Sequence, residues 1–275
     1  MWRVLFRDWQ FLLSAAVVGA IVLTGLIGPA FVRDPHKFYG APNRPPSEDF
    51  PLGTDPFGRD VLARVIVGIR TSLYVGVVAG LIGLAIGVAI GVIGGYMRGW
   101  VGEVLNLFTN MVMVFPLLPV LIILAAIFER RSLLLVATII GLVSWPWVAR
   151  ATRAQVLSLR EREFVRLARI SGDGSIKIAL LEVLPYMLAY IVMAFVLMVA
   201  GAIGAEAGIS MIGLGPTEAV SLGNLLFWAL VHEATRVGHW WTFLPPGLVI
   251  TLFAVSSLIL HRRMDQIFNP RLRTW

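Results

Sequence analysis

Six stretches of the chain contain no Asp, Glu, Lys or Arg and are each long enough to cross a lipid bilayer as a helix. The hydrocarbon core of a bilayer is about 30 Å thick, and a helix needs roughly 20 apolar residues to cross it. The stretches are residues 11–31, 71–97, 104–128, 132–149, 183–205 and 238–260. They predict an all-α, polytopic membrane protein with six transmembrane helices. A further apolar run, 219–231, is too short to span, so we expect an interfacial or re-entrant helix there.

The composition agrees with a membrane location. Only 14% of the residues are charged and 58% are hydrophobic, whereas about 25% of the residues of an average soluble domain are charged. The chain has no cysteine, which excludes disulfides, a thiolate nucleophile and any cysteine-ligated metal centre. The first apolar stretch follows Arg3 and Arg7 but is longer than the apolar core of a secretory signal, so we expect an uncleaved first span.

The positions of lysine and arginine predict the orientation of the chain. Six spans place both termini on one side, and the positive-inside rule assigns the more basic side to the cytoplasm. With the termini inside, the cytoplasmic segments hold 14 Lys and Arg residues and the outer segments hold 9. We therefore expect a multi-pass protein of a prokaryotic cytoplasmic (inner) membrane with cytoplasmic N- and C-termini. The net charge of +7 then reflects topology, and no nucleic-acid partner is expected.

The longest cytoplasmic segment, 150–184, has the pattern of two helices joined by a turn. Its residues 155–171 are rich in helix formers. One face of that helix carries Phe164, Leu167, Ala168 and Ser171. Gly172 can end this helix, and Ser175 can cap a second helix that reaches Pro185. A basic amphipathic helix of this kind either lies on anionic lipid or docks into a groove of a partner protein, and the residues alone leave both open.

The end of this segment carries Gly172 and, further along, the pair Leu184-Pro185. This arrangement resembles the cytoplasmic loop of the permease subunits of binding-protein-dependent ABC importers, whose hallmark is Glu-Ala-Ala, three residues, Gly and a distant Leu-Pro. Gly172, Leu184 and Pro185 match in register, while Arg166-Leu167-Ala168 replaces the triplet. The resemblance implies that the segment is an ATPase-docking loop. The residues that it assigns to docking are Glu163, Phe164, Arg166, Leu167, Ala168 and Gly172.

Two further stretches are similar to the dipeptide, oligopeptide and nickel branch of that family. The first, 52–64, reads Leu-Gly-Thr-Asp-Pro-Phe-Gly-Arg-Asp-Val-Leu-Ala-Arg and continues to 68–73 at the entry of the second span. Thr54 or Asp55 can cap a helix there. The second, 206–215, reads Glu-Ala-Gly-Ile-Ser-Met-Ile-Gly-Leu-Gly. It is followed by Leu222-Gly223-Asn224, Trp240-Trp241, Pro245-Pro246-Gly247 and Asn269-Pro270-Arg271-Leu272. The resemblance therefore covers about residues 50–273.

The resemblance implies that several subunits share the work. This chain would be half of a transmembrane pair, with a second homologous permease, two ATPase subunits or domains and an extracytoplasmic solute-binding protein. The sequence has no Gly-x-x-x-x-Gly-Lys-Ser/Thr phosphate loop, so ATP and Mg are expected on the partner ATPases. The chain itself is expected to bind no cofactor or metal and not to be an enzyme. Residues 1–70 would form a cytoplasmic stub, the first span and an outer segment, and residues 71–275 a five-helix permease core.

Small residues and prolines mark special positions within the spans. Gly83, Gly87, Gly91 and Gly95 recur every four residues in the second span. This spacing lets helix backbones approach closely, either within the subunit or at the second permease. Pro116 and Pro119 interrupt the third span and Pro146 the fourth. We expect kinks there, with or without a role in gating.

Other functions fit the sequence less well. His232, Glu233 and His239 lack the spacing of a metal-binding helix. Glu206, at the outer end of the fifth span, could couple ions in a secondary carrier, but the six spans themselves contain no Asp, Glu, Lys or Arg. An intramembrane hydrolase would need a His-Glu-x-x-His motif or a pair of aspartates within the membrane, and the sequence has neither. Peptides are the substrate that the branch favours, and nickel chelates and oligosaccharides remain open.

Overall fold

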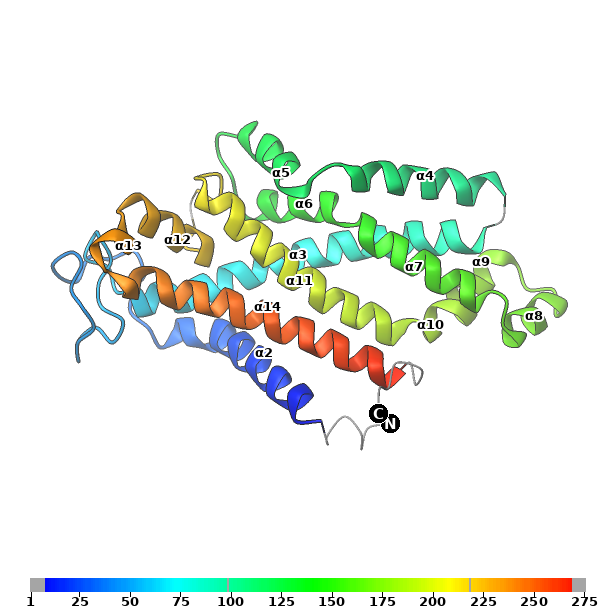
Figure 1. Cartoon of the computed structure of the whole chain (residues 1–275), viewed down its shortest axis with the longest axis horizontal. Coiled ribbons are helices and arrows are strands. Elements are labelled where there is room, and N and C mark those ends of the chain that lie inside the picture. Colours follow the sequence, from blue (N-terminus) through cyan, green and yellow to red (C-terminus); the bar gives the residue numbers. More distant parts are fainter. Residues whose placement is uncertain (1–7, 98, 218, 269–275) are drawn as a thin grey trace.

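A computed structural model of the chain describes residues 8–97, 99–217 and 219–268. The helices form an elongated bundle (Figure 1). Four unbroken helices are long and apolar enough to cross a membrane. They are α2 (Trp9–Ile27), α3 (Val61–Tyr96), α11 (Leu188–Met211) and α14 (Trp240–Phe268). The start of α2 and the end of α14 lie together, where Arg263 is 3.5 Å from the Asp8 carboxylate.

Two further crossings are bent pairs of helices. The first pair, α4 (Trp100–Val114) and α5 (Leu117–Ala126), is bent by 79°, and the second, α6 (Leu133–Ser144) and α7 (Pro146–Leu159), by 43°. If each pair is counted as one crossing, the chain has the six predicted spans. The described residues contain no β-strand beyond an isolated bridge between Thr54 and Asp60, so the all-α architecture is confirmed.

The prolines explain the two bends. Pro116 directly precedes α5, and Pro146 is the first residue of α7. Proline lacks the amide proton that a continuous helix requires, so the helix is interrupted at both positions. Pro119 lies in the first turn of α5, and that helix continues through it. The first turn tolerates proline since its amide protons have no partner within the helix.

The second span begins earlier than predicted. Helix α3 starts at Val61 instead of residue 71, and the Asp60 carboxylate caps it by accepting the amide protons of Leu62 and Ala63. The prediction that Thr54 or Asp55 caps this helix is therefore wrong. Both residues belong to the turn that precedes the cap.

The segment 150–184 is divided into more pieces than predicted. The helix expected over 155–171 is interrupted, since α7 ends at Leu159 and α8 spans Glu163–Ile170. The second helix is also interrupted. It consists of α9 (Ser175–Ile178), a π-helical turn η2 (Ala179–Val183) and α10 (Leu184–Tyr186). Gly174, and not Ser175, occupies the cap position of α9.

These interruptions move the fifth span. Because η2 and Pro185 fall at the beginning of the predicted span 183–205, the continuous helix α11 starts only at Leu188 and extends to Met211. Glu206, which the sequence places at the end of the span, therefore lies inside the helix.

The two ends of the bundle differ. At one end, which we call the α12 end, the segment 31–60 lies with α12 (Leu222–Val231) and α13 (Ala234–Val237). Helix α12 has ten residues and is the short apolar helix predicted over 219–231. The first span continues into a 3₁₀ turn, η1 (Gly28–Ala30), at this end. Helices α8, α9 and α10 gather at the opposite end, the α8 end (Figure 1).

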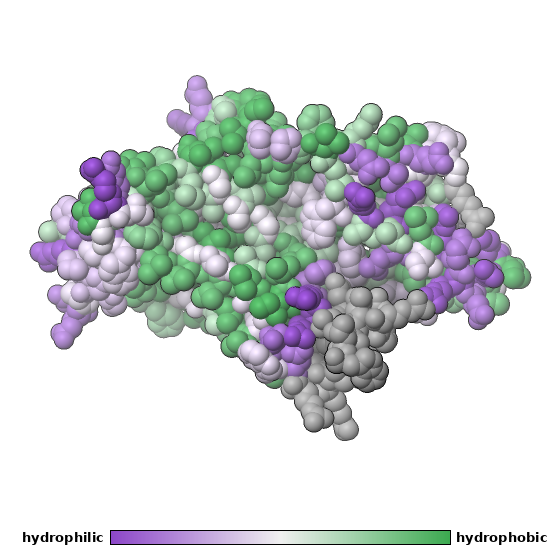
Figure 2. All heavy atoms as spheres, in the orientation of Figure 1, coloured by the Kyte–Doolittle hydropathy of each residue, from purple (hydrophilic) through white to green (hydrophobic). Residues whose placement is uncertain are grey.

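Helix α3 occupies the middle of the bundle and packs against α6, α7 and α11. The expected division between residues 70 and 71 falls inside this helix. Figure 2 shows mostly hydrophobic residues over the middle of the visible face and hydrophilic residues toward both ends, as expected for a bundle that spans a membrane. The expected N-terminal stub with Arg3 and Arg7 and the terminal stretch 269–272 lie outside the described residues.

Candidate functional site

Helix α8 divides the predicted docking face between two environments. Val165 is fully buried, and Phe164 and Ala168 pack beside it on a cluster that includes Val156, Ile178 and Val183. The Phe164 ring also stacks on Tyr186, with ring centroids 4.4 Å apart. Leu167 and Ile170 instead have 64% and 83% of their surface exposed. The expected face thus contains Phe164 and Ala168, which hold α8 on its own chain, and Leu167 and Ser171, which are exposed.

The exposed side of α8 borders a groove. The groove has a volume of about 870 Å³. Its lining includes Leu159, Glu163, Phe164, Arg166, Leu167 and Tyr186. Glu163 and Arg166 are themselves exposed. Five of the six residues that the sequence assigns to docking therefore lie on α8, and four of them line one concave surface.

The turn after α8 follows the helix-ending pattern predicted for Gly172. Its φ of +90° is a conformation that glycine adopts without strain. The amide of Gly172 donates to Arg169 O over 3.2 Å and the amide of Asp173 donates to Ala168 O over 3.1 Å, which is the Schellman arrangement. The Asp173 carboxylate then accepts a 2.5 Å hydrogen bond from Lys177, and this bond raises the pKa of Lys177 above its ordinary value.

Two arginines connect this loop to the end of α3. Arg160 Nη1 donates to Gly95 O over 2.9 Å, and Arg153 Nε donates to Gly94 O over 3.2 Å. Both carbonyls belong to the last turn of α3, where a helix has carbonyl groups without an intrahelical partner. Tyr96 of the same turn packs in the cluster that holds Val165. Helix α8 is thus joined to α3 by packing, and the end of α7 is joined to α3 by hydrogen bonds.

The four glycines of the repeat pack α3 against its own chain. A Cβ atom at Gly87, Gly91 or Gly95 would lie within 2.5–2.8 Å of the Cβ atoms of Val148, Thr152 or Val156, respectively. These three partners occupy every fourth position of α7. At Gly83 the nearest atoms belong to Met198 of α11 and Gly141 of α6. Of the two possibilities left by the sequence, close packing within the subunit is the one that the structure has.

Glu206 is fully buried at the junction of α3, α11 and α12. Its Oε1 accepts hydrogen bonds of 2.6 Å from Ser210 and from Ser221, and its Oε2 accepts one of 3.3 Å from Ser72. Ser72 Oγ in turn accepts the amide proton of Leu222, the first residue of α12. The sequence singled out this carboxylate but not its partners, because Ser72 and Ser221 lie far from it along the chain.

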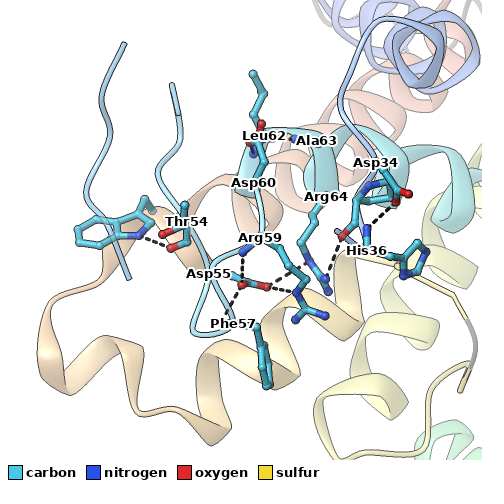
Figure 3. Close-up of polar contacts among 12 residues, drawn as sticks. Asp34, His36, Thr54, Asp55, Phe57, Arg59, Asp60, Leu62, Ala63 and Arg64 are labelled. Carbon is cyan, nitrogen blue, oxygen red and sulfur yellow. Dashed lines mark hydrogen bonds and ion pairs between the residues drawn. The ribbon is translucent and has the colours of Figure 1, made fainter. Parts of the chain in front are cut away.

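A second polar cluster organises the α12 end. The Asp55 carboxylate accepts the amide protons of Phe57 and Arg59 and an Nε hydrogen bond of 2.7 Å from Arg59 (Figure 3). Oδ2 of Asp55 also lies 3.5 Å from Nε of the buried Arg64. Trp241 Nε1 donates to Thr54 O over 3.1 Å and ties the same turn to α14. The stretch 52–60 is thus a folded turn that joins segment 31–60 to α3 and to α14.

The predicted prolines lie at the bends of the helix pairs, and the histidines of the α12 end are not arranged as a metal site. Pro116 and Pro146 stand at the two bends, and Pro119 follows the first of them. Among the described residues, no group of three or more His, Asp or Glu side chains is arranged to hold a metal ion. His232 instead packs against the rings of Phe57 and Trp228.

Comparison with known proteins identifies the family. Residues 87–274 match the model of the family described as "Binding-protein-dependent transport system inner membrane component". The chain is 34% identical over 265 residues to a "Putative peptide permease protein" of Brucella suis, covering 94% of this chain and 87% of the relative. It is 39% identical over 208 residues to the "Oligopeptide transport system permease protein OppC" of Escherichia coli K12, covering 75% and 68%. The resemblance seen in the sequence is confirmed, and the chain belongs to the family of inner-membrane components of binding-protein-dependent transport systems.

Proposed function

We propose that this chain is one of two permease subunits of an ABC importer that moves peptides across a prokaryotic cytoplasmic membrane. The observation that carries the substrate class is the similarity, over 94% and 98% of this chain, to Brucella proteins whose names describe peptide permeases. The similarity to an oligopeptide permease of Escherichia coli points in the same direction. The partners of the proposal are a second homologous permease, two ATPase subunits or domains and an extracytoplasmic solute-binding protein.

In this proposal the exposed side of α8 is the docking surface for an ATPase. An ATPase groove would receive Leu167, while Val165 and Phe164 keep the helix seated on its own subunit. Closure of the ATPases on ATP would move α8, and the Arg160–Gly95 hydrogen bond would pass that movement to α3. ATP and Mg would be bound by the ATPases, because this sequence contains no phosphate loop.

The proposal also fixes the orientation. The α8 end, which carries the arginines of segment 150–184, would face the cytoplasm, and the α12 end would face the binding protein. Single cysteines test this directly, since the chain has none of its own. Cysteines at the exposed positions Ser47 and Thr217 should react with a membrane-impermeant thiol reagent in intact cells, whereas one at the exposed Ser158 should not. Labelling of the Ser158 variant from outside would overturn the orientation.

The transport function is tested by reconstitution. The chain is co-expressed with the permease, ATPases and binding protein of its own system, and the complex is placed in proteoliposomes with a mixture of labelled short peptides. We expect peptide accumulation that requires both ATP and the binding protein. The chain by itself should neither hydrolyse ATP nor accumulate solute. Uptake driven by a proton or sodium gradient in the chain alone would favour a secondary carrier, and ATP-driven uptake restricted to nickel chelates or oligosaccharides would reject peptides as the substrate.

A further inference from the structure

Helix α4 carries polar side chains along one edge of its exposed surface. Glu103, Asn106 and Asn110 are three and four positions apart, so they follow one another along one side of the helix. Glu103 and Asn110 are exposed and Asn106 is half-buried. The described residues of α4 offer no charged or amide side chain on any other side.

The other sides of α4 have a different character. Gly102 and Thr109 are buried on the side that faces the bundle, and the Thr109 hydroxyl is satisfied by a 2.7 Å hydrogen bond to Leu105 O. The opposite flank is apolar and exposed. It consists of Trp100, Val104, Leu107, Met111 and Val114. The polar edge therefore lies between a packed side and a side that is suited to hydrocarbon.

Asn110 lies deep within the apolar part of the sequence. It is seven positions beyond Glu103, which corresponds to about 10 Å along the helix axis. Within the described part of the chain, the side-chain amide of Asn110 makes no hydrogen bond. An amide in lipid without a partner is unfavourable, because the bilayer core supplies neither donors nor acceptors. This edge of α4 is therefore unsuited to contact with lipid.

The polar edge continues toward the α8 end through residues of α7. Asn106, Arg150 and Arg153 line one crevice between α4 and α7. Arg153 is engaged with Gly94 O, whereas the exposed Arg150 follows directly on the apolar stretch 132–149. Figure 2 shows hydrophilic side chains over the part of the surface where α4 and α7 approach the α8 end. The polar side chains of α4 are thus continued toward that end by polar side chains of α7.

We propose that the edge of α4 formed by Asn106 and Asn110, continued by Arg150, lines the water-filled pathway of the solute. The proposal rests on the proposed function in that the chain forms half of such a pathway. An asparagine amide both donates and accepts hydrogen bonds, and it can exchange them with the peptide groups of a passing solute without selecting among side chains. The flank with Leu107 and Met111 faces away from this water.

Thiol labelling in the assembled complex tests the proposal. Asn110→Cys and Met111→Cys place a thiol at nearly the same depth but on the polar edge and on the apolar flank. The complex is held in lipid nanodiscs, where both faces are accessible, and is treated with a charged methanethiosulfonate. The Asn110→Cys variant should react at least about tenfold faster than Met111→Cys, because the reactive species is the thiolate and that form requires water. Asn106→Cys should also react quickly and replaces Asn110→Cys if that variant assembles poorly.

Three results would overturn the proposal. The first is a rate for Asn110→Cys no faster than for Met111→Cys while Ser47→Cys in the outer segment labels normally. The second is fast labelling of Asn110→Cys in the isolated chain but not in the complex, which would place this edge against the second permease. The third is fast labelling of both α4 variants, which would remove the distinction between edge and flank. Labelling is measured without transport, so the outcome does not depend on whether peptides are the substrate.

Discussion

Ser221 and Glu206 join two helices through a single hydroxyl group. Ser221 Oγ donates to Glu206 Oε1 over 2.6 Å and also accepts the amide proton of Asn224, so the cap of α12 is attached to the middle of the bundle. The N-terminus of a helix favours a nearby carboxylate, which adds to the attachment. The N-terminus of the short helix α12 is therefore held in place by the Glu206 side chain of the membrane-spanning helix α11.

Replacement of Glu206 should loosen this junction. Glu206→Ala leaves three serine hydroxyls without their buried acceptor, so we expect a loss of roughly 1–3 kcal/mol in the free energy of unfolding. Glu206→Gln keeps an acceptor oxygen, so its free energy of unfolding should decrease less than that of Glu206→Ala. Thermal unfolding of the purified protein in detergent measures both. Glu233→Ala is the control, because the Glu233 side chain forms an exposed ion pair with Arg236. Equal melting temperatures for the two alanine variants would contradict this account.

The glycine repeat of α3 predicts a contrast between two neighbouring positions. A methyl group at Gly91 would lie 2.5 Å from Thr152 Cβ and 2.7 Å from Ala149 O, so Gly91→Ala must push α3 and α7 apart. Overpacking of this kind costs roughly 1–3 kcal/mol. At Gly94 the nearest atom, Leu105 Cβ, would be at an ordinary 3.5 Å, and Gly94→Ala should be tolerated. The melting temperatures of the two variants test this contrast. A smaller decrease in melting temperature for Gly91→Ala than for Gly94→Ala would refute the close packing of α3 on α7.

Asp55 should be essential for the folding of segment 31–60. Asp55→Ala removes the acceptor of two backbone amides and leaves the buried Arg64 without its ion-pair partner. Breaking a buried pair in this way costs about 3–5 kcal/mol. We expect limited proteolysis to cut within residues 31–60 of this variant much faster than in the parent chain. Asp49→Ala, at an exposed position nearby, should be cut at the parent rate.

Leu167 should matter for partner binding and not for folding. Leu167→Arg adds a charge at an exposed position, so the chain should insert and purify normally. If this side chain enters an ATPase groove, the unpaired charge should reduce co-purification of the ATPase by about tenfold or more. Leu167→Met keeps an apolar side chain and should bind normally. If α8 instead rests on anionic lipid, the extra arginine is tolerated, and wild-type co-purification and uptake would then exclude docking at Leu167.

The number and approximate position of the membrane helices could be predicted from charge-free runs alone. The beginning of α3 could not, because the criterion stops at charged residues and this helix contains Arg64 and Arg70. Arg64 is accommodated only because Asp55 and the carbonyl of Pro35 lie next to it in the fold. An arginine whose partner is brought by tertiary structure is indistinguishable, in the sequence, from an arginine in water.

The loop and the Glu206 junction show the same limit. The periodicity of residues 155–171 suits one helix, but Arg160 donates to Gly95 O, and the chain turns there before α8 begins. Periodicity also grouped Leu167 with Phe164, although the neighbouring segment covers only Phe164. Of the serines around Glu206, only Ser210 is one turn away on the same helix. The other two come from segments whose approach no local pattern encodes.

The length of α3 has a mechanical consequence. Its 36 residues form a rod of about 54 Å, far longer than the roughly 30 Å of hydrocarbon that a membrane offers. One tip of the rod is held by Arg160, and the other tip is held by the Asp60 cap and by Arg64. A continuous helix shortens and bends very little, so a tilt imposed at one tip displaces the other in the opposite direction. Because Gly87, Gly91 and Gly95 hold α3 in close contact with α7, the two helices act as one lever that connects the two ends of the subunit.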